Sequence, residues 1–314
     1  MIKNTQFAGE NQKMYETVVI GSGPAGLSAA LYLKRAGKDV IVIEKEYEGA
    51  GQIARSIRVE NYLGIQALSG EELGERFRQH VLSENIPILE DEVTDIIQKE
   101  IWLVYLSSGR KLETKTLIYA AGMVPGELGI PGEKAYQGKG ISYCAYCDGS
   151  LYKGKDTAVI GGGDTALDDA LYLSDLCRKV YLIHRRDEFR GNNATVELLK
   201  KRKNVEFILE ASVKEVYGQR TLEEISLDDG RKISINGLFV AIGSFPVSDI
   251  IKSYVQTDEN GYVTAGEDGI TSSPGLFVAG DVRTKKLRQV ITAVSDGANA
   301  AVSAIQYLKF DKKR

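Results

Sequence analysis

The sequence predicts an α/β protein of two domains, each organised around a parallel sheet. The chain has 314 residues, which exceeds the length at which a single hydrophobic core stops growing. The same order of strand, glycine-rich turn, helix and strand occurs twice, 140 positions apart, as from Gly21 to Gly161. A pattern that returns at a fixed spacing predicts two copies of one supersecondary unit.

The first copy lies between Glu16 and Glu44 and reads ETVVI, GSGPAG, an Ala- and Leu-rich stretch and then DVIVIE. This order is typical of a Rossmann-like βαβ unit that binds a dinucleotide. Gly21 and Gly23 allow a tight turn and a close approach of the pyrophosphate, and Gly26 lets the helix pack on the strand. The alternative is an unrelated glycine turn, which would not explain the flanking strands, helix and acidic residue.

The second copy reads DTAVI, GGGDTA, a helix through Leu176 and then KVYLIH. It predicts a second dinucleotide site in the same chain. The copies pair in one register: Gly21 with Gly161, Gly23 with Gly163, Gly26 with Ala166, and Glu44 with His184.

The two copies differ at the end of the second strand, where the ribose contact is expected. In the first copy the carboxylate of Glu44 would bind ribose hydroxyls and repel a 2′-phosphate. The second copy places guanidinium groups there, whose forks suit bidentate contact with a phosphate. This difference favours NADPH over NADH, although Asp187 and Glu188 leave a solvated basic strand end as the alternative. The residues of the second cluster are His184, Arg185, Arg186 and Arg190.

Two cysteines lie directly before the second copy, in the segment SYCAYCDGSLY. The spacing of Cys144 and Cys147 lets their sulfurs form a reversible disulfide. Half of a tetrahedral zinc site is the alternative, but Cys177 is the only other cysteine, and His80 and His184 show no ligand spacing. We therefore expect no metal, and we expect Cys177 to be a small core residue of its apolar helix.

Acidic residues follow two of the motifs. Asp148 comes after the second cysteine, where a carboxylate would exchange a proton with a thiolate; an ordinary Asp-Gly turn is the alternative. Near the C-terminus, GLFVAGD predicts a buried strand closed by Gly280 and Asp281, and Asp281 would bind a flavin ribityl hydroxyl or cap a helix. The Ala-rich helix that follows would direct donors near Gln289 and Val290 at the electron-rich end of a flavin.

Composition and charge argue against several functions. Lys and Arg number 40 against 43 Asp and Glu, the net charge is −3, and no long basic run offers a footprint for nucleic acid. The first fourteen residues carry no apolar segment of signal-peptide length, and no later segment resembles a membrane span. Only three cysteines occur, which is typical of a reducing compartment. We therefore expect a cytoplasmic protein that binds neither nucleic acid nor a membrane.

Taken together, the motifs resemble one known family. GSGPAG, CAYCDG, GGGDTA, HRRDEFR and GLFVAGDVRTKKLRQVITAVSDGANAA are similar to the low-molecular-weight, bacterial-type thioredoxin reductases, over nearly the whole chain. Cysteines inside the nicotinamide-binding half distinguish that group from the glutathione reductase class, whose pair lies early in the flavin domain. The flavoprotein subunit of alkyl hydroperoxide reductase would carry a further N-terminal domain, and ferredoxin to NADP reductases of this fold lack the CxxC pair.

The resemblance implies a homodimer of α/β chains with two Rossmann-like domains of the three-layer ββα type. A discontinuous FAD-binding domain, residues 1–122 and 247–314, would receive an inserted NADPH-binding domain, residues 123–246. The similar segments 116–125 and 237–246 each end in Gly and Pro and would be the hinges. In the family the smaller domain rotates, so that hydride reaches the flavin first and the dithiol receives electrons second.

The resemblance also implies roles for single residues. Cys147 would face the flavin, Cys144 would attack thioredoxin, and Asp148 would handle the proton. The FAD contacts would come from Gly21, Gly23, Pro24, Ala25, Gly26, Glu44, Gln52, Asn61, Gly280, Asp281, Arg288, Gln289 and Val290. The NADPH contacts would come from Gly161, Gly163, Asp164, Thr165, Ala166, His184, Arg185, Arg186 and Arg190.

A few positions depart from the family pattern and bear on the partner. Ser150 and Leu151 stand where aromatic residues commonly help to dock thioredoxin, Tyr146 lies between the cysteines, and Leu63 replaces a common proline. The segment RGNNATVE after the arginines is also less typical. Another thioredoxin-like acceptor, a ferredoxin or NADH donor, and a redox sensor without turnover therefore stay open as alternatives.

Overall fold

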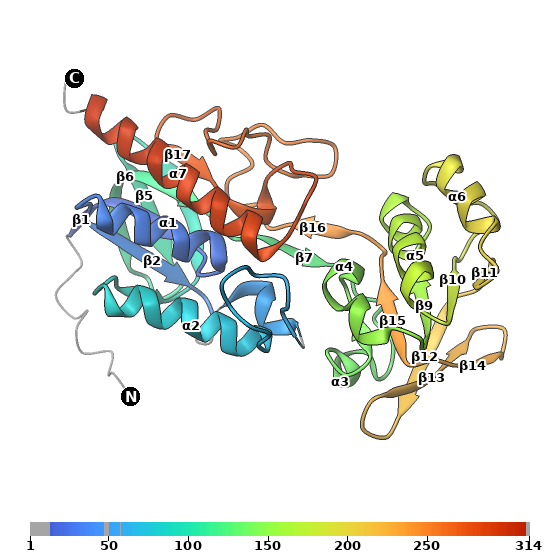
Figure 1. Ribbon diagram of the computed structural model, residues 1–314. Coiled ribbons are helices and arrows are strands. Elements are labelled where there is room, and N and C mark those ends of the chain that lie inside the picture. The colour runs from blue at the N-terminus through green and yellow to red at the C-terminus, as the bar shows by residue number, and fades with distance from the viewer. Residues whose placement is uncertain (1–12, 47–49, 57, 312–314) are drawn as a thin grey trace.

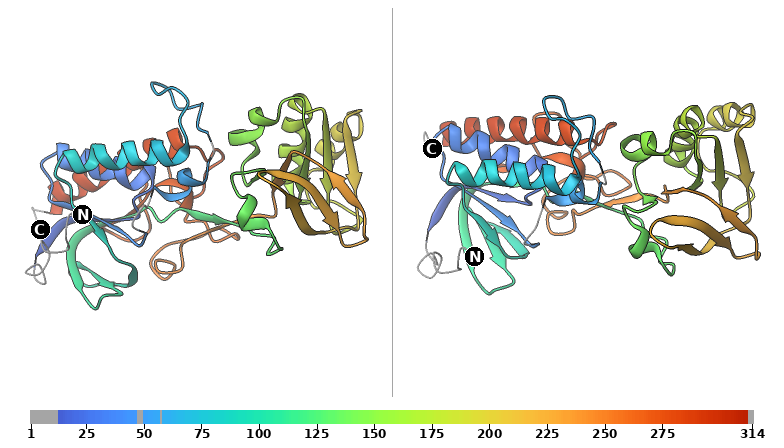
Figure 2. Two further views of the ribbon diagram at one scale, coloured as in Figure 1. Left: turned by 90° about the horizontal axis from the view of Figure 1, so that it is seen from below. Right: turned by 60° about the horizontal axis from the view of Figure 1, so that its bottom comes forward.

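The structure, a computed structural model, describes residues 13–46, 50–56 and 58–311. It has two lobes joined by a narrow waist (Figure 1), and Figure 2 shows the same lobes from two further sides. Residues 1–12, which make up most of the segment where we expected no signal peptide, lie outside the described residues.

The first lobe is built on a seven-stranded sheet. Its strands are β1 (Met14–Ile20), β2 (Val40–Glu44), β3 (Ile88–Glu90), β4 (Val93–Gln98), β5 (Trp102–Leu106), β6 (Lys111–Tyr119) and β17 (Leu276–Val278). The strand order is β3-β2-β1-β6-β5-β4, and β17 also pairs with β6. Strand β1 lies parallel to both β2 and β6, while β4, β5 and β6 form an antiparallel meander.

Three helices pack on one face of this sheet (Figure 1): α1 (Pro24–Arg35), α2 (Gly70–Ser83) and α7 (Val290–Asp311). Helix α2 starts with a capping box, in which the side chains of Ser69 and Glu72 each accept from the other's backbone N–H. Helices α1 and α7 meet through fully buried alanines such as Ala30 and Ala300. These small side chains let the two helices approach closely over the sheet. Short 3₁₀ segments are η2 (Gly51–Arg55) and η4 (Gly280–Val282).

The second lobe repeats this plan around a five-stranded parallel sheet. Its strands are β8 (Ile141–Ser142), β9 (Asp156–Ile160), β10 (Lys179–Ile183), β11 (Val205–Ile208) and β15 (Gly237–Val240), in the order β11-β10-β9-β15-β8. One face is covered by α5 (Asp164–Leu176) and α6 (Asn193–Lys200), and the other by β12 (Val213–Gly218), β13 (Leu222–Leu227) and β14 (Lys232–Ser234). Short helical segments are α3 (Glu133–Tyr136), α4 (Ala145–Asp148) and η3 (Gly149–Tyr152).

Two short strands carry the chain between the lobes. Strand β7 (Met123–Pro125) follows β6, and strand β16 (Ser244–Pro246) follows β15. They pair with each other in antiparallel order, with Val124 opposite Phe245, and they form the waist in Figure 1. The second lobe therefore lies in sequence between β6 and β17, inside the first.

These elements confirm the predicted fold class of two three-layer α/β lobes, one inserted into the other. The helix predicted through Leu176 ends there, and Cys177, which follows it, is buried in the core of the second lobe. Among the described residues, no helix combines the length and the apolar character that crossing a lipid bilayer requires.

Candidate redox and dinucleotide-binding sites

The first glycine-rich turn brings β1, α1 and β6 close together. Gly21 has a φ of +102°, which glycine adopts readily, and its N–H donates to the carbonyl of Ile43 at 2.8 Å. A Cβ atom on Gly21 would lie 2.5 Å from the carbonyl oxygen of Ala120, and one on Gly26 would overlap the carbonyl oxygen of Gly21. Both positions therefore need glycine for the helix to start so close to the strand ends.

Glu44 lies at the end of β2 and is hydrogen-bonded to the same turn. One of its carboxylate oxygens accepts from the backbone N–H of Ser22 at 2.8 Å and from the Ser22 hydroxyl at 2.9 Å. The other accepts from the backbone N–H of Glu46 at 3.2 Å. The carboxylate is thus held beside the turn, where a dinucleotide ribose is expected. Ser22 was not predicted to take part, although it stands inside GSGPAG.

Asp281 lies in η4 and offers an unused acceptor. Its Oδ1 atom is buried without a hydrogen-bond partner, and the nearest cation is Lys285 Nζ at 3.5 Å. Burial raises the pKa of Asp281. Beside it, Arg283 and Lys285 pair with the buried carboxylate of Asp296 at 2.6 and 2.9 Å, which also accepts from the N–H of Gly280 at 3.1 Å. A buried acceptor without a donor fits the hydroxyl of a bound ligand.

The second glycine-rich turn is open on one side. A Cβ atom on Gly163 would meet no other atom within 4 Å, which leaves room for a ligand there. The segment after β10 folds back onto this turn, because the N–H of Arg190 donates to the carbonyl of Gly162 at 2.7 Å. The N–H of Asn192 donates to Asp164 Oδ1 at 2.7 Å. The remaining predicted residues of the turns begin helices α1, α5 and α7 and are Pro24, Ala25, Thr165, Ala166 and Val290.

Three guanidinium groups, which we name the arginine cluster, follow β10: Arg185, Arg186 and Arg190. All three are exposed. None of them forms an ion pair with a described residue, including the neighbouring Asp187 and Glu188. Unpaired guanidinium groups beside an open glycine-rich turn fit the phosphate of a dinucleotide.

His184, the counterpart of Glu44, packs on its turn instead of hydrogen-bonding to it. Its ring stacks on Phe189 with centroids 5.4 Å apart, and a Cβ atom on Gly162 would overlap the ring. Burial lowers the pKa of His184, and the neighbouring arginines lower it further. Its Nε2 atom is buried and has no hydrogen-bond partner among the described residues.

Cys144 and Cys147 are joined by a disulfide, with their Cα atoms 5.3 Å apart. Cys144 caps the short helix α4, in which the N–H of Cys147 donates to the carbonyl of Cys144 at 3.2 Å. This single helical turn holds the two side chains on one side. The disulfide agrees with the reversible cysteine pair expected from the CxxC spacing.

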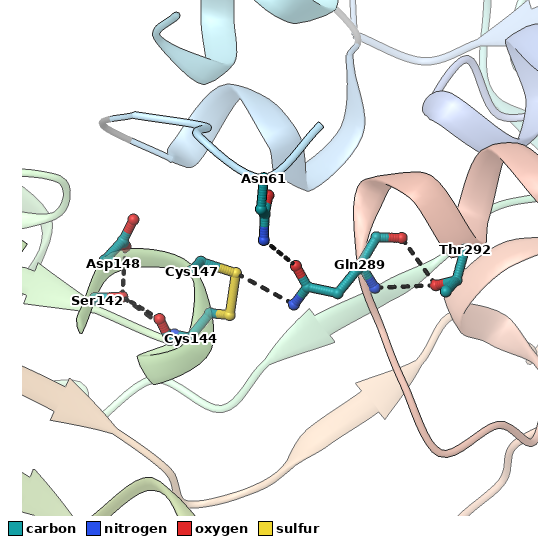
Figure 3. Close-up of a disulfide and its surroundings, with 7 residues drawn as sticks. All are labelled: Asn61, Ser142, Cys144, Cys147, Asp148, Gln289 and Thr292. Carbon is teal, nitrogen blue, oxygen red and sulfur yellow. Dashed lines mark hydrogen bonds between the residues drawn. A yellow bond between two sulfur atoms is a disulfide. The ribbon is translucent and has the colours of Figure 1, made fainter. Parts of the chain in front are cut away.

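Asp148 ends α4 and is buried, with 6% of its surface exposed. Its Oδ2 atom accepts from the hydroxyl of Ser142 at 2.6 Å, while Oδ1 is buried without a hydrogen-bond partner. Burial raises the pKa of Asp148, although the Ser142 hydrogen bond opposes this effect. Ser142 also accepts from the N–H of Cys144 at 3.1 Å and so links the acid to the cysteine pair (Figure 3). Ser142 was not predicted, because an isolated serine carries no spacing signal.

The disulfide faces the first lobe through an amide chain (Figure 3). Gln289, just before α7, directs its Nε2 atom at Cys147 Sγ, 3.7 Å away. Asn61 in turn donates to Gln289 Oε1 at 2.9 Å. Gln52 also contacts the waist, because its side-chain amide donates to the carbonyl of Met123 on β7. Residues from three distant segments thus meet around Cys147.

Arg288 reaches the waist through an aromatic ring. Its guanidinium lies 4.2 Å from the ring centroid of Tyr262, and the Tyr262 hydroxyl donates to the carbonyl of Ser244 on β16 at 3.2 Å. Tyr262 was not predicted, because a tyrosine in a polar loop carries no recognisable signal. The arginine next to Gln289 is thereby connected to the strand that joins the lobes.

Nearly the whole chain is similar to proteins of one known family. Residues 15–297 match the model of the pyridine nucleotide-disulphide oxidoreductase family. A thioredoxin reductase of Mycoplasma genitalium is 40% identical over 309 residues, which cover 95% of this chain and 97% of that protein. The crystal structure of thioredoxin reductase from Streptococcus pyogenes superposes with a TM-score of 0.90 at 36% identity, over 95% of this chain and 99% of that one.

A further solved structure superposes less well at similar coverage. The thioredoxin reductase of Lactococcus lactis, described as being in the FR conformation, gives a TM-score of 0.65 at 32% identity, over 94% of this chain and 99% of that one. The matches extend through both lobes and include the segment of the disulfide. The chain therefore belongs to the pyridine nucleotide-disulphide oxidoreductase family, within the low-molecular-weight, bacterial-type thioredoxin reductases.

Proposed function

We propose that this chain uses NADPH to reduce thioredoxin, through FAD and the Cys144–Cys147 disulfide. The contact of Cys147 Sγ with Gln289 at 3.7 Å carries the proposal, because it brings the disulfide of one lobe to the flavin-binding segment expected in the other. The relatives whose names describe thioredoxin reductases support thioredoxin as the acceptor.

FAD and NADPH are the cofactors of this family. When bound, FAD would supply the two-electron chemistry that connects NADPH to the disulfide. In the first lobe, Glu44 would bind a ribose, Asp281 would accept from a ribityl hydroxyl, and the N-terminus of α7 at Val290 would present backbone donors. In the second lobe, the arginine cluster would bind the 2′-phosphate.

The protein side chains then handle sulfur and protons. Two-electron reduction breaks the bond between the Cys144 and Cys147 sulfurs and leaves two thiolates that take up protons. Asp148 would supply one proton, since burial raises its pKa and Ser142 fixes one of its oxygens. Cys144 would then attack the disulfide of the partner, and Cys147 would resolve the mixed disulfide and release the reduced partner.

We assign FAD to residues 1–122 and 247–314, and NADPH to residues 123–246. Nicotinamide and disulfide lie on one lobe and cannot both occupy the same face of the flavin, so the lobes must change orientation during turnover. The waist strands β7 and β16 would be the hinges. The TM-score of 0.65 to the Lactococcus lactis structure, against 0.90 to the Streptococcus pyogenes structure at similar identity, supports two arrangements of the lobes.

Insulin reduction with NADPH and the organism's own thioredoxin tests the proposal. We expect the wild type to turn over, and Cys144→Ser to lose essentially all activity because no mixed disulfide forms. Cys177→Ser is the matched control, because Cys177 is buried and takes no part in the disulfide. Wild-type turnover by Cys144→Ser would overturn the dithiol route.

Stopped-flow reduction of the flavin tests the electron donor separately. We expect NADPH to bleach the flavin absorption within seconds and NADH to do so more slowly. If neither nucleotide bleaches the flavin, the donor assignment is wrong, and a ferredoxin donor becomes the next hypothesis to test.

We also infer a homodimer that works in the cytoplasm. Family resemblance supports the dimer, and the use of only three cysteines supports a reducing compartment. Light scattering coupled to size exclusion should give twice the chain mass of 34.4 kDa. Cell fractionation checks the compartment.

A further inference from the structure

An exposed tyrosine, Tyr146, stacks on a partly buried one, Tyr172, beside the cysteine pair. Tyr146, which stands between Cys144 and Cys147 in α4, is 53% exposed. Its ring lies over that of Tyr172 in α5, with centroids 4.5 Å apart and an angle of 27° between the planes. Aromatic rings are normally buried because they gain most from leaving water. An aromatic ring that stays half exposed, as Tyr146 does, is therefore typical of an interaction surface.

The position of this stack is fixed by close packing. Tyr172 lies against Gly149, where a Cβ atom would approach to 2.9 Å from the tyrosine ring. Tyr172 is therefore held between helix α5 and the end of α4. The Tyr146 ring stacks on the Tyr172 ring. Tyr146 lies in the same helical turn as the two cysteines, so its position is fixed relative to them.

Negative charge adjoins the stack. Asp168, one turn before Tyr172 in α5, is exposed and forms no hydrogen bond or ion pair with any residue that the structure describes. Burial raises the pKa of Tyr146, and the charges of Asp168 and Asp169 raise it further. The surface thus combines an aromatic face with a free carboxylate.

The chemistry of Cys144 brings a partner to this surface. A mixed disulfide holds the two Cα atoms about 4.4–6.8 Å apart, and Tyr146 follows Cys144 by two residues, so their Cα atoms are at most about 7 Å apart. The cysteine of the partner must therefore come within about 14 Å of the Tyr146 Cα atom. The partner surface that flanks its disulfide consequently passes close to the two rings.

The geometry points to Tyr146, Tyr172 and Asp168 as the docking surface for the disulfide-bearing partner. The partner it fits carries a lysine or arginine next to an apolar surface at its own cysteine pair. Such a cation would bind the ring faces and pair with Asp168. This inference rests on the proposed function, in which Cys144 attacks a protein disulfide, and it assigns a recognition role to a tyrosine inside the CxxC motif.

Steady-state kinetics of the FAD-loaded enzyme with thioredoxin tests the inference. Tyr146→Ala should raise the KM for thioredoxin about tenfold, because truncating an aromatic residue at a binding surface removes much of the affinity. The kcat and the rate at which NADPH bleaches the flavin should stay at wild-type values. Tyr146→Phe keeps the stacked ring and should keep a KM close to that of the wild type.

Asp168→Lys tests the charge. Salt screens the attraction between Asp168 and a cation of the partner, so the wild-type KM for thioredoxin should increase with salt. Asp168→Lys replaces this attraction by repulsion, so the KM should be higher and should no longer increase with salt. Leu198→Ala is the matched control for the truncation in Tyr146→Ala, because Leu198 is an apolar residue that is 50% exposed on α6 of the same lobe.

Two outcomes would overturn the inference: an unchanged KM in Tyr146→Ala, or an equal rise in Tyr146→Phe and Tyr146→Ala. Failure of the proposed function looks different, because the wild type itself would then not reduce thioredoxin.

Discussion

The two nucleotide-binding units share a backbone plan but fasten their glycine-rich turns in different ways. In the first unit, the Glu44 carboxylate accepts two hydrogen bonds from Ser22. At the equivalent positions of the second unit, the His184 ring packs directly over Gly162. One turn is therefore held by charge-assisted hydrogen bonds and the other by van der Waals contact. The same βαβ backbone thus carries either an acidic side chain or a cluster of basic side chains at the end of its second strand.

The first helices of the two units, α1 and α5, also differ in how tightly they pack. Gly26 in α1 leaves no space for a Cβ atom, whereas Ala166 fills the equivalent place in α5. Ala29 in α1 is completely buried, but its counterpart in α5 is Asp169, which is also buried. The first helix is thus packed to its steric limit, while the second buries a carboxyl group. Four predictions test this comparison.

Exchanging the third small residue of the glycine-rich motif, Gly26 in the first unit and Ala166 in the second, should have the largest effect on stability. Gly26→Ala would place a methyl group against the carbonyl oxygen of Gly21, so we expect a loss of about 3 kcal/mol or more in stability and reduced FAD content. The reverse change, Ala166→Gly, should cost only about 1 kcal/mol. Urea unfolding and the ratio of flavin to protein measure both. Equal losses in the two variants would contradict the packing difference.

Removing the arginine cluster should change donor preference next most strongly. Replacing Arg185, Arg186 and Arg190 with alanine should raise the KM for NADPH about a hundredfold, or about 2.8 kcal/mol. This is less than the sum of three charge-assisted hydrogen bonds of about 1.5–3 kcal/mol each, because solvent screens exposed guanidinium groups. The KM for NADH should barely change. Arg178→Ala is the control, because Arg178 is exposed on the same lobe but paired with Asp156. An equal loss for both nucleotides would show that the cluster does not read the 2′-phosphate.

The buried Asp169 should make stability depend on pH. Burial, with a smaller contribution from Asp168, raises the pKa of Asp169 from 3.8 to about 7. Between these values the folded protein binds more protons than the unfolded chain, so the free energy of unfolding falls as pH rises through this window. The full linkage energy of this shift is about 4 kcal/mol. Because local relaxation and water penetration relieve part of the cost of a buried charge, Asp169→Asn should stabilise the protein by roughly 2 kcal/mol at pH 8 and hardly at pH 4.

Denaturation of the FAD-loaded enzyme at both pH values measures the effect of Asp169→Asn. Asp175→Asn is the control, because Asp175 is exposed on the same helix. A stabilisation by Asp169→Asn that is the same at pH 4 and pH 8 would contradict the raised pKa.

Neutralising the acidic ribose end should have the smallest effect of the four. Glu44→Gln keeps one oxygen acceptor for Ser22 but loses the charge, so we expect FAD to bind about fivefold more weakly, or about 1 kcal/mol. Fluorescence of released flavin measures the dissociation constant. Glu46→Gln, at an exposed neighbouring position, should bind FAD as the wild type does. Unchanged binding by Glu44→Gln would remove the carboxylate from the ribose site.

Much of the architecture could be predicted because glycine spacing and strand hydrophobicity are local signals. Gly21 and Gly161 each mark a strand-to-helix turn, and both units form as predicted. The disulfide between Cys144 and Cys147 could be predicted for the same reason, since four residues contain the whole motif.

Contacts between distant segments could not be predicted in this way. Gln289 lies 142 positions from Cys147, and no sequence pattern in either segment predicts that their side chains are in contact. The sequence also does not show that Asp169 is buried, because an acidic residue on a helix is normally solvated. Ser142 and Tyr262 gain their roles only when β8 and the waist are in place. The family resemblance indicated Gln289 as a flavin contact but not its approach to Cys147.

Strands β7 and β16 are hydrogen-bonded neighbours, so the inserted lobe leaves and rejoins the first lobe at a single point. Strands β6 and β17 already lie side by side in the first sheet, which means that this sheet is complete without the insertion. A gene for this protein can therefore be recombined as a cassette with both junctions in one two-stranded ribbon. Grafting the second lobe of a relative at these junctions would exchange the arginine cluster and the cysteine pair together, and would leave the residues of the seven-stranded sheet unchanged.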